Sequence, residues 1–253
     1  MGRMKISVII PVKGQTEVLL KNLKDKVIPY FDSRKGITYD VLIAPNGSSE
    51  EEQKALLEGV KGLPAQVKVL PFIPYGAKGL AVKNAILSSC CDYDLFFDAD
   101  LATDLSAFEL IEPELGHYDA FIADRDMKGS VQNKRPFKRW LGHVGSKALV
   151  KLRFHLHGID DTQCGYKCFR DSVAKEMAKR QIIEAFAFDV EYCYFLSLNR
   201  FNVKRIPVRW FNDERGSTVS FASASKKFSK DLSAIKKNKA AYVLSKQERE
   251  ALC

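Results

Sequence analysis

The chain of 253 residues has no long apolar run. The run in MGRMKISVIIPV is far shorter than the roughly 20 apolar residues of a spanning helix. It is also too short for a secretory signal peptide. We therefore expect neither a leader nor a spanning segment, and any work on a membrane would be done from its surface.

Cysteine and histidine are too sparse to suggest a disulfide framework or a zinc site by their spacing. There are six cysteines and four histidines. Cys164 and Cys168 are four apart, yet no second pair completes a zinc-binding set. His155 and His157 lack a third ligand at a suitable spacing. We expect small buried thiols in a reducing cytoplasm and histidines at the surface.

The common phosphate-binding loops are also missing. The segment GAKGLAVK, residues 76–83, has two glycines that allow close backbone approach and two lysines, Lys78 and Lys83. It lacks the Gly-Lys-Ser/Thr of a Walker A loop and does not match GxGxxG. A phosphate contact through Lys78 and a plain loop before a helix fit this segment about equally well.

What the chain does have is positive charge. Its formal net charge is +9 and its pI is about 9.2, with 46% hydrophobic and 28% charged residues. Basic proteins usually meet phosphates in nucleic acids, nucleotides or anionic membranes. Aromatics interleaved with basic residues on a sheet, or a recognisable nucleic-acid module, are not evident. We therefore expect no nucleic-acid partner.

The first hundred residues alternate between strand-like and helix-like segments. Short apolar runs at 5–12, 39–45, 65–72 and 92–100 are typical of buried strands, and residues 16–31, 46–60 and 76–91 have helical patterns. Either Ser48 with Glu51 or Ser49 with Glu52 can form a capping box. This alternation predicts an α/β fold with a mostly parallel, mixed sheet, whose ligands bind at the carboxyl ends of the strands.

The second half is less regular. Residues 118–124 are typical of a strand, 125–139 of a basic loop and 140–158 of a basic amphipathic helix. A turn and short strand follow in DTQCGYKCFR, then a helix in AFDVEYCYFLSLNR. We predict one catalytic domain, residues 1–220, and a Lys-rich C-terminal extension, residues 221–253.

Two carboxylates follow the fourth predicted strand directly, in DLFFDAD. Asp98 and Asp100, two residues apart at a strand end, can share one divalent cation and the diphosphate that it neutralises. An ordinary turn with an Asx cap would also place two acids here. The position at the end of a strand in an alternating sheet favours the metal site.

A polar turn, APNGSS, follows the second predicted strand. Asn46 and the turn's backbone amides could contact a nucleotide base or ribose. By itself, a tight turn with a good helix cap explains the segment at least as well.

The order of these motifs resembles family 2 of the glycosyltransferases over about residues 5–220. The segments are VIIPV, PNGSS, GAKGLAVKNAIL, YDLFFDADLAT, DTQCGYKCF, AFDVE and IPVRW. DADLAT together with DTQCGYK is similar to the polyprenyl-phosphate hexosyltransferase branch, which includes the dolichyl-phosphate β-glucosyltransferases. The resemblance implies a GT-A, Rossmann-like fold, a nucleotide-sugar donor, Mg²⁺ or Mn²⁺, and a lipid phosphate acceptor.

On the donor side, the resemblance implies five residues. Pro11 and Val12, at the end of the first strand, match the edge that binds the base. Asn46 matches an acidic residue that touches the base. Asp98 and Asp100 match the DxD motif that holds the metal and the diphosphate.

On the acceptor side, the resemblance implies five more. Asp161, Thr162 and Gln163 match a segment that lines the sugar and the acceptor. Arg215 and Ser217 match a segment near the mouth of the site that contacts phosphate. The catalytic roles then fall on Asp100, Asp161 and Arg215.

The chain departs from the family pattern at two donor-side motifs. PVKGQTE replaces the usual VxxYNE, and PNGS replaces DDGS, so Pro45 and Asn46 stand where two acids are usual. An asparagine amide can both donate and accept, so the base remains open, with UDP-glucose favoured and GDP-mannose second.

The expected chemistry is a single displacement with inversion. A lipid phosphate has a second pKa near ~6 and arrives ionised. It therefore needs cations rather than a general base, and Asp161 becomes a positioning group. The cations would come from Arg215 and the basic loop, at Lys128, Lys134, Arg135, Lys138 and Arg139.

Two alternatives remain open. A soluble sugar or a glycan could replace the lipid acceptor. A sugar nucleotidyltransferase would also use this kind of fold, but PVKGQTE is a poor match to the Gly-rich loop expected after its first strand.

The basic segments suggest where the enzyme works. Residues 125–153 mix lysine and arginine with Trp140 and several aliphatic side chains, as in helices that lie on anionic membranes. A normal helix with a solvated charged face is the alternative. We expect a cytoplasmic protein at the cytoplasmic membrane face.

Overall fold

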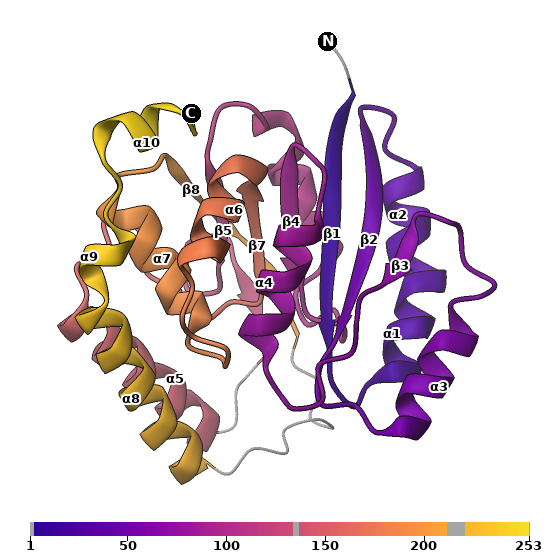
Figure 1. The fold of residues 1–253 in the computed structure, drawn as a ribbon, viewed down its shortest axis with the longest axis horizontal. Coiled ribbons are helices and arrows are strands. Elements are labelled where there is room, and N and C mark those ends of the chain that lie inside the picture. The colour runs from indigo at the N-terminus through magenta and orange to yellow at the C-terminus, as the bar shows by residue number, and fades with distance from the viewer. Residues whose placement is uncertain (1–2, 134–136, 212–220, 253) are drawn as a thin grey trace.

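The computed structural model describes residues 3–133, 137–211 and 221–252. A seven-stranded sheet with the order β3-β2-β1-β4-β7-β5-β8 forms its centre (Figure 1). Only β7 runs antiparallel to its neighbours, so the predicted mostly parallel, mixed α/β sheet is confirmed. The strands of this sheet are β1 Met4–Val12, β2 Ile37–Pro45, β3 Val67–Val69, β4 Tyr93–Phe97, β5 Ala120–Asp124, β7 Tyr166–Arg170 and β8 Val203–Pro207.

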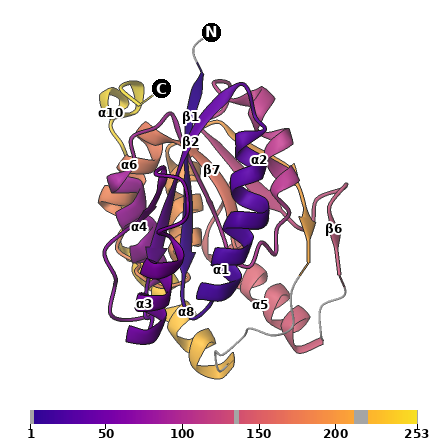
Figure 2. The same ribbon diagram turned by 90° about the vertical axis from the view of Figure 1, so that its right-hand side faces the viewer.

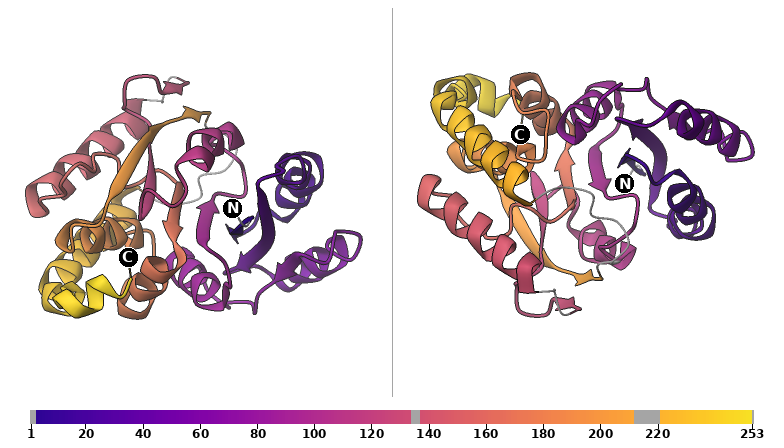
Figure 3. Two further views of the ribbon diagram at one scale, coloured as in Figure 1. Left: turned by 90° about the horizontal axis from the view of Figure 1, so that it is seen from above. Right: turned by 90° about the horizontal axis from the view of Figure 1, so that it is seen from below.

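The sheet is covered on both faces, which explains its continuous apolar strands. In β1, Val8 and Ile10 enter one core while Ile9 between them enters the other. A strand buried on both faces is apolar along most of its length, unlike an alternating, half-solvated strand. Figure 3 shows the helices on either side of the sheet.

Helices from the first half pack mainly on one face. They are α1 Thr16–Asn22, the π-helical η1 Leu23–Val27, α2 Ile28–Asp32 and α3 Glu50–Gly59, with the 3₁₀ turns η2 Leu105–Leu110 and η3 Glu112–Glu114. Ser49, not Ser48, caps α3: Ser49 Oγ accepts from Glu52 N, and Glu52 Oε2 accepts from Ser49 N at 2.8 Å. This bond pair fixes the start of α3 directly after the carboxyl end of β2 (Figure 2).

The other face is covered by α4 Lys78–Ser88, α6 Asp171–Arg180 and α7 Phe188–Leu198. A small second sheet pairs β6 Val131–Gln132 with β9 Arg209–Trp210. Beyond α7 lie α5 Phe137–Arg153 and α8 Phe221–Lys237, which run side by side (Figure 1). The predicted basic helix at 140–158 therefore begins three residues earlier and ends five residues earlier.

The last thirty residues complete the core. Leu232 and Ile235 of α8 are fully buried, and Tyr242 of α9 Lys239–Tyr242 donates a hydrogen bond to Glu191 Oε1 at 2.5 Å. The last helix is α10 Lys246–Glu250. The predicted boundary at residue 220 falls at the end of 212–220, a segment outside the described residues. The helices after it share one core with the catalytic domain.

Within the ranges that the structure describes, no helix combines the length and the apolar character needed to cross a membrane.

Candidate active site

The turn after β4 places two carboxylates at the carboxyl end of the sheet. β4 is buried along its whole length between β1 and β7, and Asp98 is the first residue beyond it. Leu101 N donates to Asp98 O at 3.0 Å, and Ala102 N donates to Asp100 Oδ1 at 2.9 Å. Leu101 adopts a left-handed φ of 52°. The turn therefore has a fixed shape, with both carboxylates at the sheet edge where ligands bind in α/β folds.

Lys78, from the GAKGLAVK segment, is the first residue of α4 and contacts the DxD turn. Its Nζ is 2.5 Å from Asp98 Oδ1. Burial lowers the pKa of Lys78, but the charges of Asp98, Asp189 and Asp100 outweigh burial and raise it overall. The lysine is therefore a firmly charged partner of the DxD turn. Whether it contacts donor phosphate stays a prediction.

The electrostatic setting of Asp100 differs from that of a surface aspartate. Burial, and then the charge of neighbouring Asp98, raise the pKa of Asp100. A divalent cation between the two would remove this repulsion. Their oxygen-only donor set suits Mg²⁺ or Mn²⁺.

A glycine makes room for Asp98. A Cβ built on Gly165, just before β7, would overlap the Asp98 carboxylate. The backbone φ of Gly165 is not in the left-handed region, so a side chain here is opposed by crowding alone and would force the Asp98 carboxylate to move. Sequence reasoning quoted this glycine in DTQCGYK but assigned it no role.

Beneath the DxD turn lies a buried ion pair that sequence reasoning also missed. Lys167 Nζ, on β7, donates to Asp189 Oδ1 and, at 2.6 Å, to Cys164 O. Burial raises the pKa of Asp189, while Lys167 and Lys78 lower it. Asp189 thus faces two cations, and Lys78 faces three carboxylates. The GYK and AFDVE motifs contain these residues, but their 22-residue separation gave no sign of a pair.

Asp161 is held by Arg125 from the end of β5. Arg125 Nε donates to Asp161 Oδ2 at 2.7 Å and Nη2 donates to Oδ1 at 2.8 Å, with a further bond from Arg125 N at 3.2 Å. Burial raises the pKa of Asp161, but these bonds and the guanidinium charge hold it at about 2. The guanidinium also lies 5.3 Å from the ring centroid of Trp210. A carboxylate bound at both oxygens suits positioning and is a poor proton acceptor.

The two residues after Asp161 differ in exposure and bonding. Thr162 is buried. Gln163 N donates to Asp161 Oδ1 at 3.2 Å, whereas Gln163 Nε2 is buried and has no hydrogen-bond partner among the described residues. A buried amide donor without a partner is costly, so this nitrogen is a fitting contact for a bound substrate.

The predicted base-binding residues form a tight backbone junction. Asn46 Nδ2 donates to Val12 O at 3.1 Å, and Asn46 Oδ1 accepts from Ala77 N at 3.0 Å. The amide therefore joins the end of β1, where Pro11 and Val12 are buried, to the start of α4. The described contacts of Asn46 are structural, and its contact with a base stays a prediction.

Two glycines, Gly47 and Gly76, allow the loops at this junction between β1 and α4 to approach closely. Gly47 has a φ of +63°, and a Cβ there would lie 2.7 Å from Gly76 N. A Cβ on Gly76 would meet Lys13 Nζ at 2.6 Å. Two loops from distant parts of the chain thus touch through their backbones, and Lys13 is a further cation beside them that sequence reasoning did not select.

Several predicted residues cannot be placed. Arg215 and Ser217 lie in 212–220, outside the described residues, as do Lys134 and Arg135 in 134–136. The side chains of Lys138 and Arg139 are likewise not described. Of the predicted basic loop, Lys128 is described and is exposed.

Sequence comparison links this chain to known enzymes. No family model matches it. The dolichyl-phosphate beta-glucosyltransferase of Dictyostelium discoideum is 28% identical over 243 residues, covering 90% of this chain and 72% of the relative. The Drosophila melanogaster and Homo sapiens enzymes of the same name are 29% and 27% identical, each covering 87% of this chain and 71% of the relative.

Solved structures show the same fold. Glucosyl-3-phosphoglycerate synthase of Mycobacterium tuberculosis, in complex with Mn²⁺, UDP and glucosyl-3-phosphoglycerate, aligns with a TM-score of 0.64 at 13% identity, covering 96% of this chain and 82% of that one. Mannosyl-3-phosphoglycerate synthase of Rubrobacter xylanophilus aligns with a TM-score of 0.57 at 12% identity, covering 92% and 72%. The chain therefore has the GT-A fold of these structures, and in sequence it is similar to the dolichyl-phosphate beta-glucosyltransferases of the polyprenyl-phosphate hexosyltransferase branch of family 2.

Proposed function

We propose that the chain transfers glucose from UDP-glucose to a polyprenyl phosphate, with inversion at the anomeric carbon. The observation that carries this proposal is the Asp98–Ala99–Asp100 turn with Lys78 at 2.5 Å, at the carboxyl end of β4. The names of the sequence relatives support glucose and a lipid phosphate as the substrates. UDP is the nucleotide named for the M. tuberculosis structure with the same fold.

The donor site needs positive charge where the leaving diphosphate gains negative charge. Asp98 and Asp100 would hold Mg²⁺ or Mn²⁺, which supplies that charge. Lys78 pairs with Asp98 and adds a fixed cation beside the same turn. Lys13, at the junction of the two loops, adds another.

The acceptor side fits a phosphate better than a sugar hydroxyl. A hydroxyl needs a general base, but Asp161 is locked to Arg125 and its pKa is held at about 2. A phosphate monoester is already ionised near neutral pH, because its second pKa is about 6. Arg125 and the predicted cations of the basic loop and Arg215 would offset its repulsion from the donor. Such a reaction would take place at the cytoplasmic membrane face.

The Arg125–Asp161 contact also supports inversion at the anomeric carbon. A retaining, two-step reaction requires a free carboxylate nucleophile next to the anomeric carbon. Both Asp161 oxygens accept hydrogen bonds from Arg125, so this carboxylate is a poor nucleophile. A single displacement on a UDP-α-glucose donor gives a β-linked product.

Radiolabelled donors offered to the purified chain with Mg²⁺ or Mn²⁺ and detergent-dispersed polyprenyl phosphate test the proposal. We expect glucose from UDP-glucose to enter the organic phase, with GDP-mannose a much weaker donor and a β linkage by NMR. Asp100→Asn should reduce the rate by at least ~100-fold, the order seen for removing one electrostatic group from an active site. Transfer only to soluble acceptors such as 3-phosphoglycerate would overturn the lipid acceptor, and GDP-mannose as the better donor would overturn UDP-glucose.

A further inference from the structure

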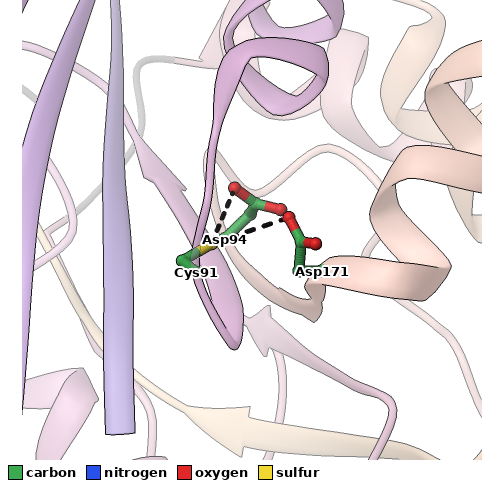
Figure 4. A group of neighbouring side chains, drawn as sticks. All are labelled: Cys91, Asp94 and Asp171. Atoms are coloured by element: carbon green, nitrogen blue, oxygen red, sulfur yellow. Dashed lines mark hydrogen bonds between the residues drawn. The ribbon is translucent and has the colours of Figure 1, made fainter.

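A second cluster of potential metal ligands lies far from the DxD turn. Cys91 precedes β4, Asp94 is the second residue of β4 and Asp171 opens α6. One ligand atom from each lies within 4.8 Å of the other two (Figure 4). Asp94 and Asp98 are four residues apart on an extended strand, so about 13 Å separates the cluster from the sugar site.

Asp94 is a buried carboxylate whose two oxygens differ in their hydrogen bonding. The residue is 1% exposed, and its Oδ1 accepts the Cys91 thiol at 3.4 Å. Asp94 Oδ2 is buried and has no hydrogen-bond partner within the described part of the chain. Figure 4 shows this carboxylate facing that of Asp171. Two carboxylates this close, one of them buried and the other partly buried, repel each other unless a proton or a metal ion lies between them.

The two sulfur-to-oxygen distances are compatible with a tetrahedral metal ion. Cys91 Sγ lies 3.4 Å from Asp94 Oδ1 and 3.7 Å from Asp171 Oδ1. With Zn–S near ~2.3 Å and Zn–O near ~2.0–2.2 Å, the sulfur and oxygen ligands of a tetrahedral zinc ion lie about 3.5–3.7 Å apart. The three side chains can therefore bind such an ion with little movement.

The charges also balance. Lys175 Nζ lies 2.8 Å from Asp171 Oδ2. A thiolate and two carboxylates carry three negative charges, which the two charges of a divalent ion and that of Lys175 neutralise. The sulfur ligand selects zinc over Mg²⁺ and Mn²⁺, which prefer oxygen ligands alone.

We propose that Cys91, Asp94 and Asp171 form a structural Zn²⁺ site that fastens the first turn of α6 to the start of β4. Zinc binding would displace the protons of the Cys91 thiol and the Asp94 carboxyl, which pass to solvent. The Ser89 hydroxyl, which donates to Asp171 Oδ1 at 3.0 Å, lies at the rim of the cluster. This site is independent of the proposed sugar transfer.

Cobalt titration of the full chain, stripped of metals with a chelator, tests the site. We expect one equivalent of Co²⁺ to produce a sulfur-to-cobalt charge-transfer band in the near ultraviolet. The DxD turn has no sulfur and cannot contribute to this band. Cys91→Ser should abolish the band, whereas Cys90→Ser, at the exposed neighbouring cysteine, should retain it.

Thermal unfolding with Zn²⁺ gives an independent readout. At about a hundredfold excess over Kd, zinc should raise the Tm of the wild type by roughly 5–10 °C. Asp94→Asn keeps the shape of the side chain and offers an N–H to Asp171, so it should fold, and zinc should no longer raise its Tm. A wild type without the cobalt band and without a zinc-dependent Tm shift would show that the carboxylates share only a proton. A band that persists in Cys91→Ser would also overturn the site.

Discussion

The aspartates of the active site lie in opposite electrostatic environments. Burial, and then the charge of Asp98, raise the pKa of Asp100, whereas Arg125 holds the pKa of Asp161 at about 2. Environments that move the pKa values of two carboxylates apart usually indicate different roles. Asp100 is suited to receive a cation, and Asp161, already neutralised, is suited to fix the position of Arg125.

The Arg125–Asp161 pair predicts a pH-dependent stability. The folded-state pKa of Asp161, about 2, lies below the value of about 3.9 for an unfolded aspartate. Its contribution is therefore present above pH ~4 and is lost as the pH falls towards ~2, by roughly 2 kcal/mol. In Asp161→Asn, the free energy of unfolding should drop by about 3–5 kcal/mol at pH 7, because Arg125 is left buried and unpaired. Urea titrations at pH 7, 4 and 2.5 should show this difference from the wild type shrinking with acid.

The neighbouring residue provides a matched control. Asp160 is exposed and pairs with Arg205 at the surface. Asp160→Asn should change the free energy of unfolding by less than ~1 kcal/mol at each pH. An Asp161→Asn variant that matches this control at pH 7 would contradict the role given to the pair.

At the level of elements, the sequence predicted the first half of the sheet well. The β-branched runs at 5–12 and 39–45 overlap β1 and β2, and the DxD motif does follow β4. These features are local, because a strand buried on both faces is apolar and a polar turn must follow it. The antiparallel direction of β7, in contrast, is not determined by the residues of the strand itself. It depends on the connection from α5, which no short pattern reveals.

Side chains paired across long separations were also beyond the sequence. Lys167 is the second residue of β7 and is fully buried, which a strand pattern alone would reject. It is tolerated because Asp189 and the Cys164 carbonyl satisfy it. Likewise, Asp161 was selected but its partner Arg125, 36 residues earlier, was counted only as part of a basic loop.

The segment before β7 predicts a sharp effect of a small substitution. Gly165→Ala should lower kcat/KM for the donor by about 10–100-fold, since the new methyl group displaces the Asp98 carboxylate from Lys78 and the DxD turn. Stability should change little, because Asp98 is partly exposed and can move. Steady-state kinetics and thermal unfolding check both parts. Gly62→Ala, which meets no atom within 4 Å, should leave the kinetics unchanged. Full activity in Gly165→Ala would mean that Asp98 is not needed where it lies.

The packing of α8 into the core predicts that a substitution there lowers the stability of the whole protein. Leu232 is fully buried among residues of the α4–α6–α7 face. Leu232→Ala should lower the free energy of unfolding by about 2–5 kcal/mol, through lost burial and a residual cavity. Chemical denaturation measures the change, and Lys246→Ala, at a surface position of α10, should stay within ~0.5 kcal/mol. An equally small effect at Leu232 would show that α8 is not part of the cooperative core.

At the scale of the whole molecule, positive charge and apolar side chains coincide near α5 and α8. Leu152 of α5 is 82% exposed and Val144 is 41% exposed. Lys226, Lys227 and Lys230 are exposed residues of α8, the helix that runs beside α5 (Figure 1). Exposed apolar side chains next to lysines are typical of surfaces that bind anionic membranes.

This arrangement predicts that one side of the molecule binds lipid. Changing Lys226, Lys227 and Lys230 together to glutamate should weaken binding to phosphatidylserine-rich vesicles by at least ~100-fold, because each lysine near the surface contributes about 1 kcal/mol. Sedimentation of the full chain with vesicles at low and physiological salt measures this, and salt should weaken wild-type binding. The matched control reverses Lys21, Lys24 and Lys26, exposed lysines near α1 on the far side of the sheet, which changes the net charge equally. Equal losses in both variants would show that net charge alone, rather than the α5–α8 surface, attracts the membrane.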